Sequence, residues 1–351
     1  MLPIRLTFAL FGMFWGTWAV SAFDIQRFLG LSESQLGLLV AATVAGTTVS
    51  NVIGGTLAER RGAQRAIVIA LAVWGPLVVV VALLPTPGPW MVGFLAVVAA
   101  GGLLDVIVNI ASAGMLVGRP GRLLQVHASY NGGAVVGAAV AGLALAVDDD
   151  LWRLPWALVG GSAVVLAVVV ARRPGWVPAV TTGDHVTLRD AASELRRSGL
   201  LRLAVVFTFG AAVEGGIGTF GVLYLRDRLD VAVLAGAGAY VAGQGLATIT
   251  RSVLGRTDQR VAGTRAAKAG LLLAATGLAL EAATDIPAVA AIGLAVAAIG
   301  VATYWPLLSA VANGASDRPG LAVGGVSAAG YLGFLLGPVV VGAVADGFGL
   351  R

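Results

Sequence analysis

Two carboxylic acids lie near the middle of long apolar stretches of this sequence. Asp105 lies in the stretch 91–117 and Glu214 in the stretch 200–225. If these stretches lie in hydrocarbon, a charge at either position costs at least about 2.5–3.5 kcal/mol, so each carboxyl must face a polar interior or carry a proton. A carboxyl in an apolar setting can titrate near physiological pH. Asp105 and Glu214 are therefore predicted to couple transport to protons, with a structural hydrogen bond between helices as the alternative for each.

Polar side chains elsewhere in the apolar stretches predict a binding site for a small solute. Asn109 is four residues beyond Asp105, so the two share one face of a helix. Aromatic rings with a polar edge bind the faces of sugars, although such rings also pack in cores or face lipid. The predicted substrate-binding residues are Asn109, Trp18, Asn131, Gln244, Tyr304 and Tyr331.

The composition implies that membrane helices position these residues. Hydrophobic residues make up 58% of the 351 residues and charged residues 12%, against about a quarter charged in ordinary globular proteins. The mean hydropathy is +0.91. These values exclude a pair of soluble domains and a disordered chain, and the absence of cysteine excludes a disulfide scaffold. We predict an all-α membrane protein.

A membrane helix needs about 20 predominantly apolar residues. Eleven stretches of the sequence meet this requirement, without the alternation expected of a barrel strand. They are about 6–23, 36–57, 66–84, 91–117, 123–147, 154–171, 200–225, 233–253, 266–283, 287–312 and 321–345.

The distribution of basic residues predicts the orientation. With the N-terminus in the cytoplasm, most of the 23 basic residues fall in cytoplasmic loops. The exceptions are Arg27, Arg153, Arg226, Arg228 and Arg351. Positive charge concentrates on the cytoplasmic side of membrane proteins. We therefore expect a multi-pass protein of the inner (cytoplasmic) membrane, and the basic pI needs no nucleic-acid partner.

A polar segment and an internal repeat divide the chain. Residues 172–199 contain no apolar stretch of membrane length. A shift of 200 residues superimposes three glycines on three others, namely Gly133, Gly137 and Gly142 on Gly333, Gly337 and Gly342. We predict an N-terminal six-helix bundle (1–171), a cytoplasmic linker (172–199) and a C-terminal bundle (200–351) with five spans. The repeat leads us to expect twelve spans, with the twelfth missing after Arg351.

The segment 55–65, GTLAERRGAQR, predicts a breakable latch between helix ends. A carboxylate at the end of one helix can pair with guanidinium groups in a tight glycine turn, and a topogenic basic turn is the alternative. A weaker second copy of this segment runs from Arg251 to Arg265. His127 lies about one turn inside the stretch 123–147. The predicted gating residues are Gly55, Glu59, Arg60, Gly62, Arg65, His127, Arg251, Asp258 and Arg265.

The segment 55–65 resembles the cytoplasmic loop signature of the major facilitator superfamily, G-x-L-a-D-r-x-G-r-[RK]-x. Further segments resemble the fucose-permease-related branch of bacterial inner-membrane proteins. They are LGLS at 29–32 with QLGLL at 35–39, LDV at 104–106 with Asn109, Gly121-Arg122 with His127, VEG at 213–215, and GYLGFLLGP at 330–338. The resemblance implies a fold of two bundles and twelve spans, a proton-coupling role for Asp105 and a sugar-like solute.

These observations predict a secondary active transporter that moves a small polar solute by alternating access, coupled to protons. A proton-coupled exporter of drugs or metabolites is one alternative. The other is a non-transporting receptor or scaffold with the same fold. We expect a monomer whose partners are the solute, protons and the lipid bilayer. The sequence has no Walker A loop, metal-ligand cluster or catalytic triad, so we predict neither an enzyme nor a cofactor or metal site.

Overall fold

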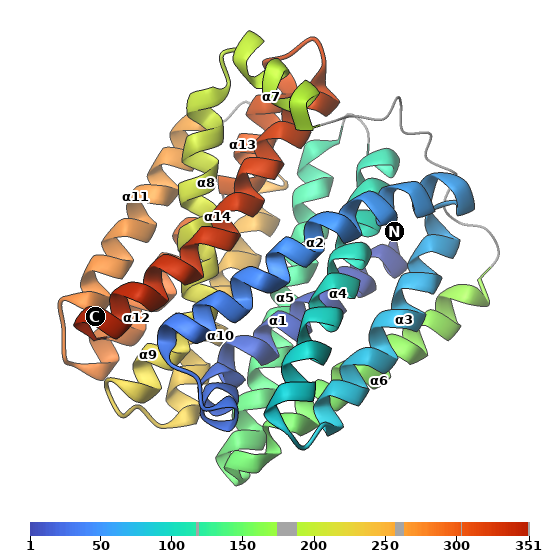
Figure 1. Cartoon of the computed structure of the whole chain (residues 1–351). Helices are drawn as coiled ribbons and strands as arrows, with labels where there is room; N and C mark the ends of the chain where they lie inside the picture. The colour runs from blue at the N-terminus through green and yellow to red at the C-terminus, as the bar shows by residue number, and fades with distance from the viewer. Residues whose placement is uncertain (117–118, 174–187, 257–262, 303, 350–351) are drawn as a thin grey trace.

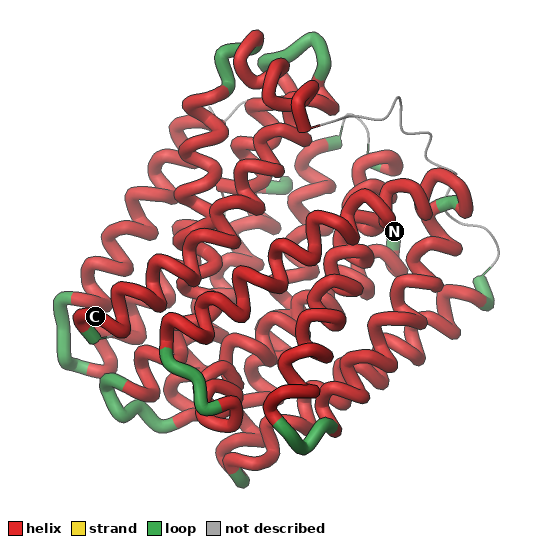
Figure 2. Tube along the Cα trace, viewed as in Figure 1, coloured by secondary structure: helices red, strands yellow, loops and turns green. Residues whose placement is uncertain are grey.

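The chain folds into helices joined by short loops. A computed structural model describes residues 1–116, 119–173, 188–256, 263–302 and 304–349. Figure 2 shows no strand among these residues, which confirms the predicted all-α class. The elements, in chain order, are α1 (Leu2–Leu29), α2 (Glu33–Arg61), α3 (Ala63–Leu83), α4 (Pro87–Met115), α5 (Pro120–Val147), η1 (Asp149–Trp152), α6 (Arg153–Ala171), α7 (Leu188–Arg197), α8 (Leu201–Gly216), η2 (Ile217–Gly221), α9 (Val222–Asp227), α10 (Val233–Leu254), α11 (Gly263–Ala282), α12 (Pro287–Val301), α13 (Tyr304–Gly314) and α14 (Pro319–Phe348).

Much of this helical structure is suited to a membrane. Among the described residues, eight helical segments are long and apolar enough to cross one, by length and composition. The helix α12 is apolar but shorter. The remaining predicted spans fall on α2, α11 and the pair α12 and α13, so the count of eleven stays a prediction.

Local sequence signals set the turns between the first helices. Helix α1 ends at Gly30, whose φ of 63° lies in the left-handed region that glycine adopts at little cost. Helix α2 begins with a capping box, in which the Ser32 hydroxyl accepts from the amide of Gln35 and the Gln35 side chain accepts from the amide of Ser32. Gly62, with a φ of 76°, makes the turn from α2 to α3. These turns reverse the direction of the chain between α1 and α2 and between α2 and α3.

The stretch predicted as one span over 287–312 is divided into two helices. Helix α12 ends at Val301 and α13 begins at Tyr304. Pro306 lies in the first turn of α13, and a proline has no amide hydrogen to donate to the carbonyl four residues earlier. That carbonyl belongs to Ala302, which can therefore accept a hydrogen bond from another element.

The helices form two groups (Figure 1). Helices α1–α6 pack on one another, as do helices α8–α14. The groups meet chiefly where α5 contacts α10, where α2 contacts α14, and where α1 contacts η2 and α9. We call the face that carries the N-terminus and α7 the proximal face. The opposite face, where α1 ends and α2 begins, is the distal face.

Helices α5 and α14 occupy equivalent positions in the two groups. A methyl group at Gly133 of α5 would collide with the carbonyl of Ala9 in α1. A methyl group at Gly333 of α14 would collide with the carbonyl of Thr208 in α8. Two of the glycine pairs related by the 200-residue shift, Gly133 with Gly333 and Gly137 with Gly337, therefore allow the same close helix packing in each group.

The short helix α7 is fastened to the proximal face. The Glu194 side chain is almost fully buried and accepts hydrogen bonds from the hydroxyls of Ser198 at 2.6 Å and Ser316 at 2.7 Å. It also pairs with Arg197 at 2.9 Å. The two serine hydroxyls, followed by Arg197, hold the pKa of Glu194 below its ordinary value. The ionised carboxylate thus ties α7 to the loop that precedes α14.

Candidate functional site

Asp105 joins the two helix groups. It is half-buried on α4 and its Oδ1 accepts a hydrogen bond from Asn109 Nδ2 at 3.0 Å. Its Oδ2 accepts from the hydroxyl of Tyr331, on α14, at 3.2 Å. Asn109 Nδ2 also reaches the carbonyl of Asp105 at 3.0 Å, which fixes the orientation of the amide. The structure brings together these three residues, all of which the sequence singled out.

Glu214 has a comparable partner within the second group. It lies half-buried on α8, and its Oε2 accepts a hydrogen bond from the hydroxyl of Tyr304, on α13, at 2.9 Å. The Tyr304 ring is fully buried and packs where a side chain at Gly210 would stand. The π-helical turn η2 begins at Ile217, three residues after Glu214. Such turns occur frequently at functional sites.

Asn131, Gln244 and Arg251 form a second polar cluster where α5 meets α10. Asn131 Nδ2 donates to Gln244 Oε1 at 2.5 Å, and Arg251 Nη1 donates to Asn131 Oδ1 at 2.5 Å. Arg251 Nε donates to the carbonyl of Ala302 at 2.7 Å. This is the carbonyl that proline 306 leaves without an intrahelical donor.

Arg251 lies inside a helix and not in a loop. The sequence predicts Arg251 as a basic gating residue on the cytoplasmic side, whereas the structure places it in α10 with only 5% of its surface exposed. Its gating role stays a prediction. The side chain points inward because Asn131 and the carbonyl of Ala302 satisfy its donors there. Proline 306 was the sequence signal for such an acceptor.

Trp18 lies apart from both clusters. Its side chain is 1% exposed and stacks on Phe94 with the ring centroids 4.8 Å apart. Trp156 contacts it edge-on, so the ring is sealed inside the group α1–α6. In this structure the Trp18 ring packs against other aromatic rings, and its substrate-binding role stays a prediction.

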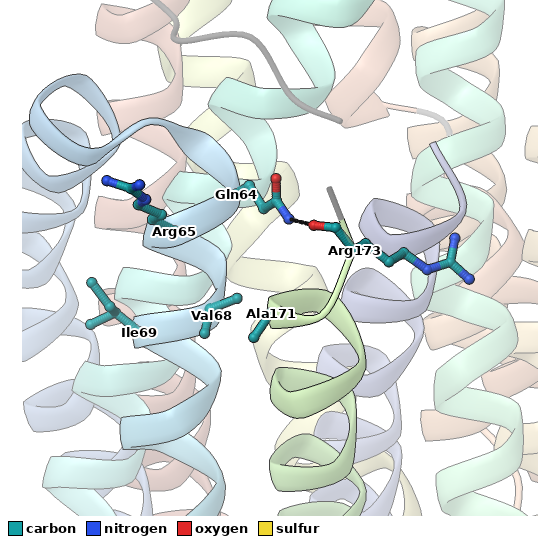
Figure 3. Close-up of a pocket in the computed structure, with 6 residues that line it drawn as sticks. All are labelled: Gln64, Arg65, Val68, Ile69, Ala171 and Arg173. Atoms are coloured by element: carbon teal, nitrogen blue, oxygen red, sulfur yellow. Dashed lines mark hydrogen bonds between the residues drawn. The ribbon is translucent and has the colours of Figure 1, made fainter. Parts of the chain in front are cut away.

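The glycine turn of the predicted latch borders a hollow between α3 and α6 (Figure 3). The residues that line this hollow are Gln64, Arg65, Val68, Ile69, Ala171 and Arg173. Gln64 Nε2 donates to the carbonyl of Arg173 at 2.7 Å, which links the turn to the end of α6. Figure 3 shows the guanidinium groups of Arg65 and Arg173 pointing away from one another.

The latch itself stays a prediction. Arg60, Arg65 and Arg265 are exposed, and none takes part in an ion pair recorded within the described ranges. The side chain of Glu59 and the whole of Asp258 lie outside the described residues. Gly62 makes the expected turn, whereas a methyl group at Gly55 would meet open space.

His127 packs against a helix of its own group. It lies half-buried on α5, and its ring centroid is 5.1 Å from that of Phe8 on α1. This contact places His127 inside the group α1–α6, and its gating role stays a prediction.

Sequence reasoning missed the contacts that join the two groups at the distal face. The Asp24 carboxylate on α1 receives two hydrogen bonds from Arg226 on α9, at 2.5 and 3.0 Å. The Arg226 guanidinium also lies 4.5 Å from the Phe23 ring centroid. A second contact joins Asp346 of α14 to the amide of Ser34 on α2 at 3.2 Å. The one available signal was the acidic Asp24 at the end of an apolar helix.

The central residues offer proton exchange and hydrogen bonding. Two carboxyls, one from each helix group, each accept a phenol hydrogen bond, and a guanidinium lies in the neighbouring cluster. Within the ranges that the structure describes, no group of three or more histidine or acidic side chains is placed to hold a metal ion.

Comparisons with known proteins converge on one family. The model of the Major Facilitator Superfamily matches residues 6–338. The membrane protein MosC of Rhizobium meliloti is 25% identical over 359 aligned positions, covering 99% of this chain and 84% of that protein. An uncharacterised MFS-type transporter of Yersinia pestis is 27% identical over 362 positions, covering 97% and 88%.

A solved structure shares the fold. The nucleoside transporter NupG, crystallised as a mutant, superimposes with a TM-score of 0.77 and covers 99% of this chain and 92% of its own. The two sequences are 14% identical, so this likeness concerns the fold alone.

Proposed function

The chain belongs to the major facilitator superfamily and is therefore a multi-pass membrane transporter and not an enzyme, and we propose that it moves a small polar solute by proton-coupled alternating access. The nucleoside carried by the transporter of similar fold is one example of such a solute.

Asp105 and Glu214 carry this proposal. One comes from each helix group, both lie half-buried in apolar helices, and each is held by a tyrosine hydroxyl. An ionisable residue inside a membrane protein faces the bundle interior and marks a path for a solute or a proton. Asn109, bonded to Asp105, and Gln244, bonded to Asn131, supply amide groups for a polar solute.

The basic residues support a cytoplasmic N-terminus in the inner membrane, which makes the proximal face the cytoplasmic one. In this arrangement residues 1–171 and 200–351 are the two moving bundles, and 172–199 is their cytoplasmic linker. The pair of Asp24 with Arg226 and the contact of Asp346 with Ser34 then close the outer side. Alternating access requires that these contacts break when the outer side opens.

Uptake into proteoliposomes under an imposed pH gradient tests proton coupling. We expect labelled polar solutes, including nucleosides and sugars, to accumulate only when the gradient is present. Asp105→Asn should abolish this accumulation while solute exchange continues, because the amide keeps the shape of the carboxyl but cannot carry the proton.

Asp285→Asn is the matched control, since Asp285 is an exposed carboxylate whose side chain is 81% accessible. It should accumulate solute like the unaltered protein. Full gradient-driven uptake by Asp105→Asn would refute proton carriage by Asp105.

A further inference from the structure

Arg251 extends from near the proximal end of α10 toward the middle of the protein. A Cβ at Gly255, the residue that caps the end of α10, would lie 2.6 Å from the carbonyl oxygen of Gly121 and 3.0 Å from Gln125 Cγ, both in α5. The hydrogen-bond partner of Arg251 on α5, Asn131, lies ten residues beyond Gly121, or about 15 Å along the helix axis. The guanidinium is therefore directed into the interior and away from the proximal face.

Within the described residues, the recorded hydrogen-bond partners of this buried cation are neutral. Its two recorded acceptors are the amide oxygen of Asn131 and the carbonyl of Ala302. Of the ion pairs within 4.0 Å in the described part of the chain, none includes Arg251. A charge buried in a protein is costly unless an opposite charge compensates it. The hydrogen bonds that the guanidinium donates to these neutral oxygens orient it but do not neutralise its charge.

Polar groups that could hold a solute surround the guanidinium. Glu214, Tyr130 and Tyr304 lie close enough to interact with it electrostatically. Tyr130, Glu214 and Gln244 are all half-buried, so each keeps surface that a small molecule can touch. The hydroxyl of Tyr304 donates its hydrogen to Glu214 and so cannot donate it to an anion. The positively charged guanidinium of Arg251 is the group in this cluster that is suited to bind an anion.

We propose that the transported solute carries an oxyanion, a carboxylate or a phosphate, and that Arg251 binds it. This inference rests on the proposed transport function and narrows its substrate class. A planar guanidinium presents a fork of N–H donors that matches the two oxygens of such a group. Asn131 holds the fork in position and is in turn held by Gln244. An ionised Glu214 and the bound oxyanion would compete for the same positive charge, which gives a physical link between solute and proton.

Matched pairs of probes test the charge requirement. The purified full-length protein in detergent is heated with gluconate or sorbitol, and with glycerol 3-phosphate or glycerol, each at millimolar concentration. The melting temperature should rise with at least one anionic member and with neither neutral member. Comparison of the two anions distinguishes carboxylate from phosphate. Equal shifts with the neutral members, or no shift with either anion, would overturn the proposal.

Variants locate the binding to Arg251. Arg251→Gln should raise the dissociation constant of the effective anion about tenfold or more, the loss expected for a charge-assisted hydrogen bond. Arg251→Lys should bind with intermediate affinity because it keeps the charge but loses the fork. Arg256→Gln is the matched control, since Arg256 is an exposed arginine just past the end of the same helix. Undiminished anion binding by a folded Arg251→Gln would refute the assignment.

The outcomes separate this inference from the proposed function. Anion binding that depends on Arg251, without uptake driven by a pH gradient, would refute proton coupling and leave the inference standing. Gradient-driven uptake of a neutral solute by Arg251→Gln at the unaltered rate would refute the inference and support the proposed function.

Discussion

Each central carboxyl is held by a phenol from α13 or α14. Tyr331 donates to Asp105 and Tyr304 donates to Glu214. A hydrogen bond to a charged group contributes about 1.5–3 kcal/mol, roughly twice the contribution of a neutral one. The tyrosine hydroxyls therefore influence how the carboxyls bind protons. Because both tyrosines belong to the second helix group, movement of α13 or α14 would change these hydrogen bonds.

Tyr304→Phe should lower gradient-driven uptake about tenfold or more without unfolding the protein. The substitution removes the hydroxyl that binds Glu214 but keeps the ring packed against Gly210. Initial uptake rates in proteoliposomes measure the effect. Trp18→Phe is the contrasting variant, because the sealed Trp18 ring contributes packing alone. This variant should lower the free energy of unfolding by about 1–3 kcal/mol and leave uptake unchanged. The reverse pattern would place Trp18 in the solute site.

At the scale of elements, the helices could be predicted because long apolar stretches bounded by charge or glycine have few alternatives in a membrane. The direction in which each side chain points could not be predicted from the sequence. Trp18 and Tyr304 both lie in apolar stretches, yet Trp18 packs in its own group while Tyr304 reaches Glu214. Direction depends on which helix lies beside which, and this information comes from contacts distant in sequence. Pro306 made it predictable that the carbonyl of Ala302 lacks an intrahelical donor and can accept a hydrogen bond from another element, here Arg251.

The attachment of α7 should depend on pH through Glu194. Hydrogen bonds from Ser198 and Ser316, and the pair with Arg197, lower the pKa of Glu194 in the folded state. The unfolded value is about 4.3. A lowered pKa means that the carboxylate stabilises the attachment above about pH 4.3, and that the stabilisation is lost as the pH falls through the folded-state pKa.

A spin label at the exposed position 192 of α7 measures this attachment. Its mobility should be low at pH 6 and should increase as the pH falls below about 4.3 and through the lowered folded-state pKa of Glu194. Glu194→Gln should show high mobility at every pH. A pH-independent, immobile label in the unaltered protein would contradict the role of Glu194.

At the scale of the whole molecule, the two groups are joined at the distal face by charged and polar contacts. Asp24 and Arg226 form a forked pair, and Asp346 binds Ser34. Such contacts can form and break repeatedly, unlike the apolar packing within each group. Opening of the distal face therefore requires that these few contacts break.

Asp24→Asn should shift the conformational equilibrium toward an open distal face. The chain has no cysteine, so cysteines introduced at Asp149 and Ile286 can be spin-labelled on opposite groups without background. We expect the variant to populate longer distances between the labels. Exchange of the charges, with Asp24→Arg and Arg226→Asp together, should restore the shorter distances.

Arg228→Gln provides the control for this measurement, because the Arg228 pair with Asp285 is exposed and 3.9 Å long. It should leave the distance distribution unchanged. Identical distributions for Asp24→Asn and the unaltered protein would mean that the forked pair does not hold the face closed.

The unequal placement of tryptophan gives the protein a built-in optical signal. Trp18, Trp74, Trp90 and Trp156 are fully buried in the first group, whereas Trp305 is the only tryptophan of residues 200–351. The Trp305 ring lies 6.1 Å from that of Tyr331, whose hydroxyl binds Asp105. Quenching of intrinsic fluorescence by a solute bound at these residues should therefore involve Trp305, over a constant blue-shifted emission from the sealed rings. In a Trp15→Phe background, which removes the half-buried Trp15 of α1, Trp305→Phe should remove this quenching.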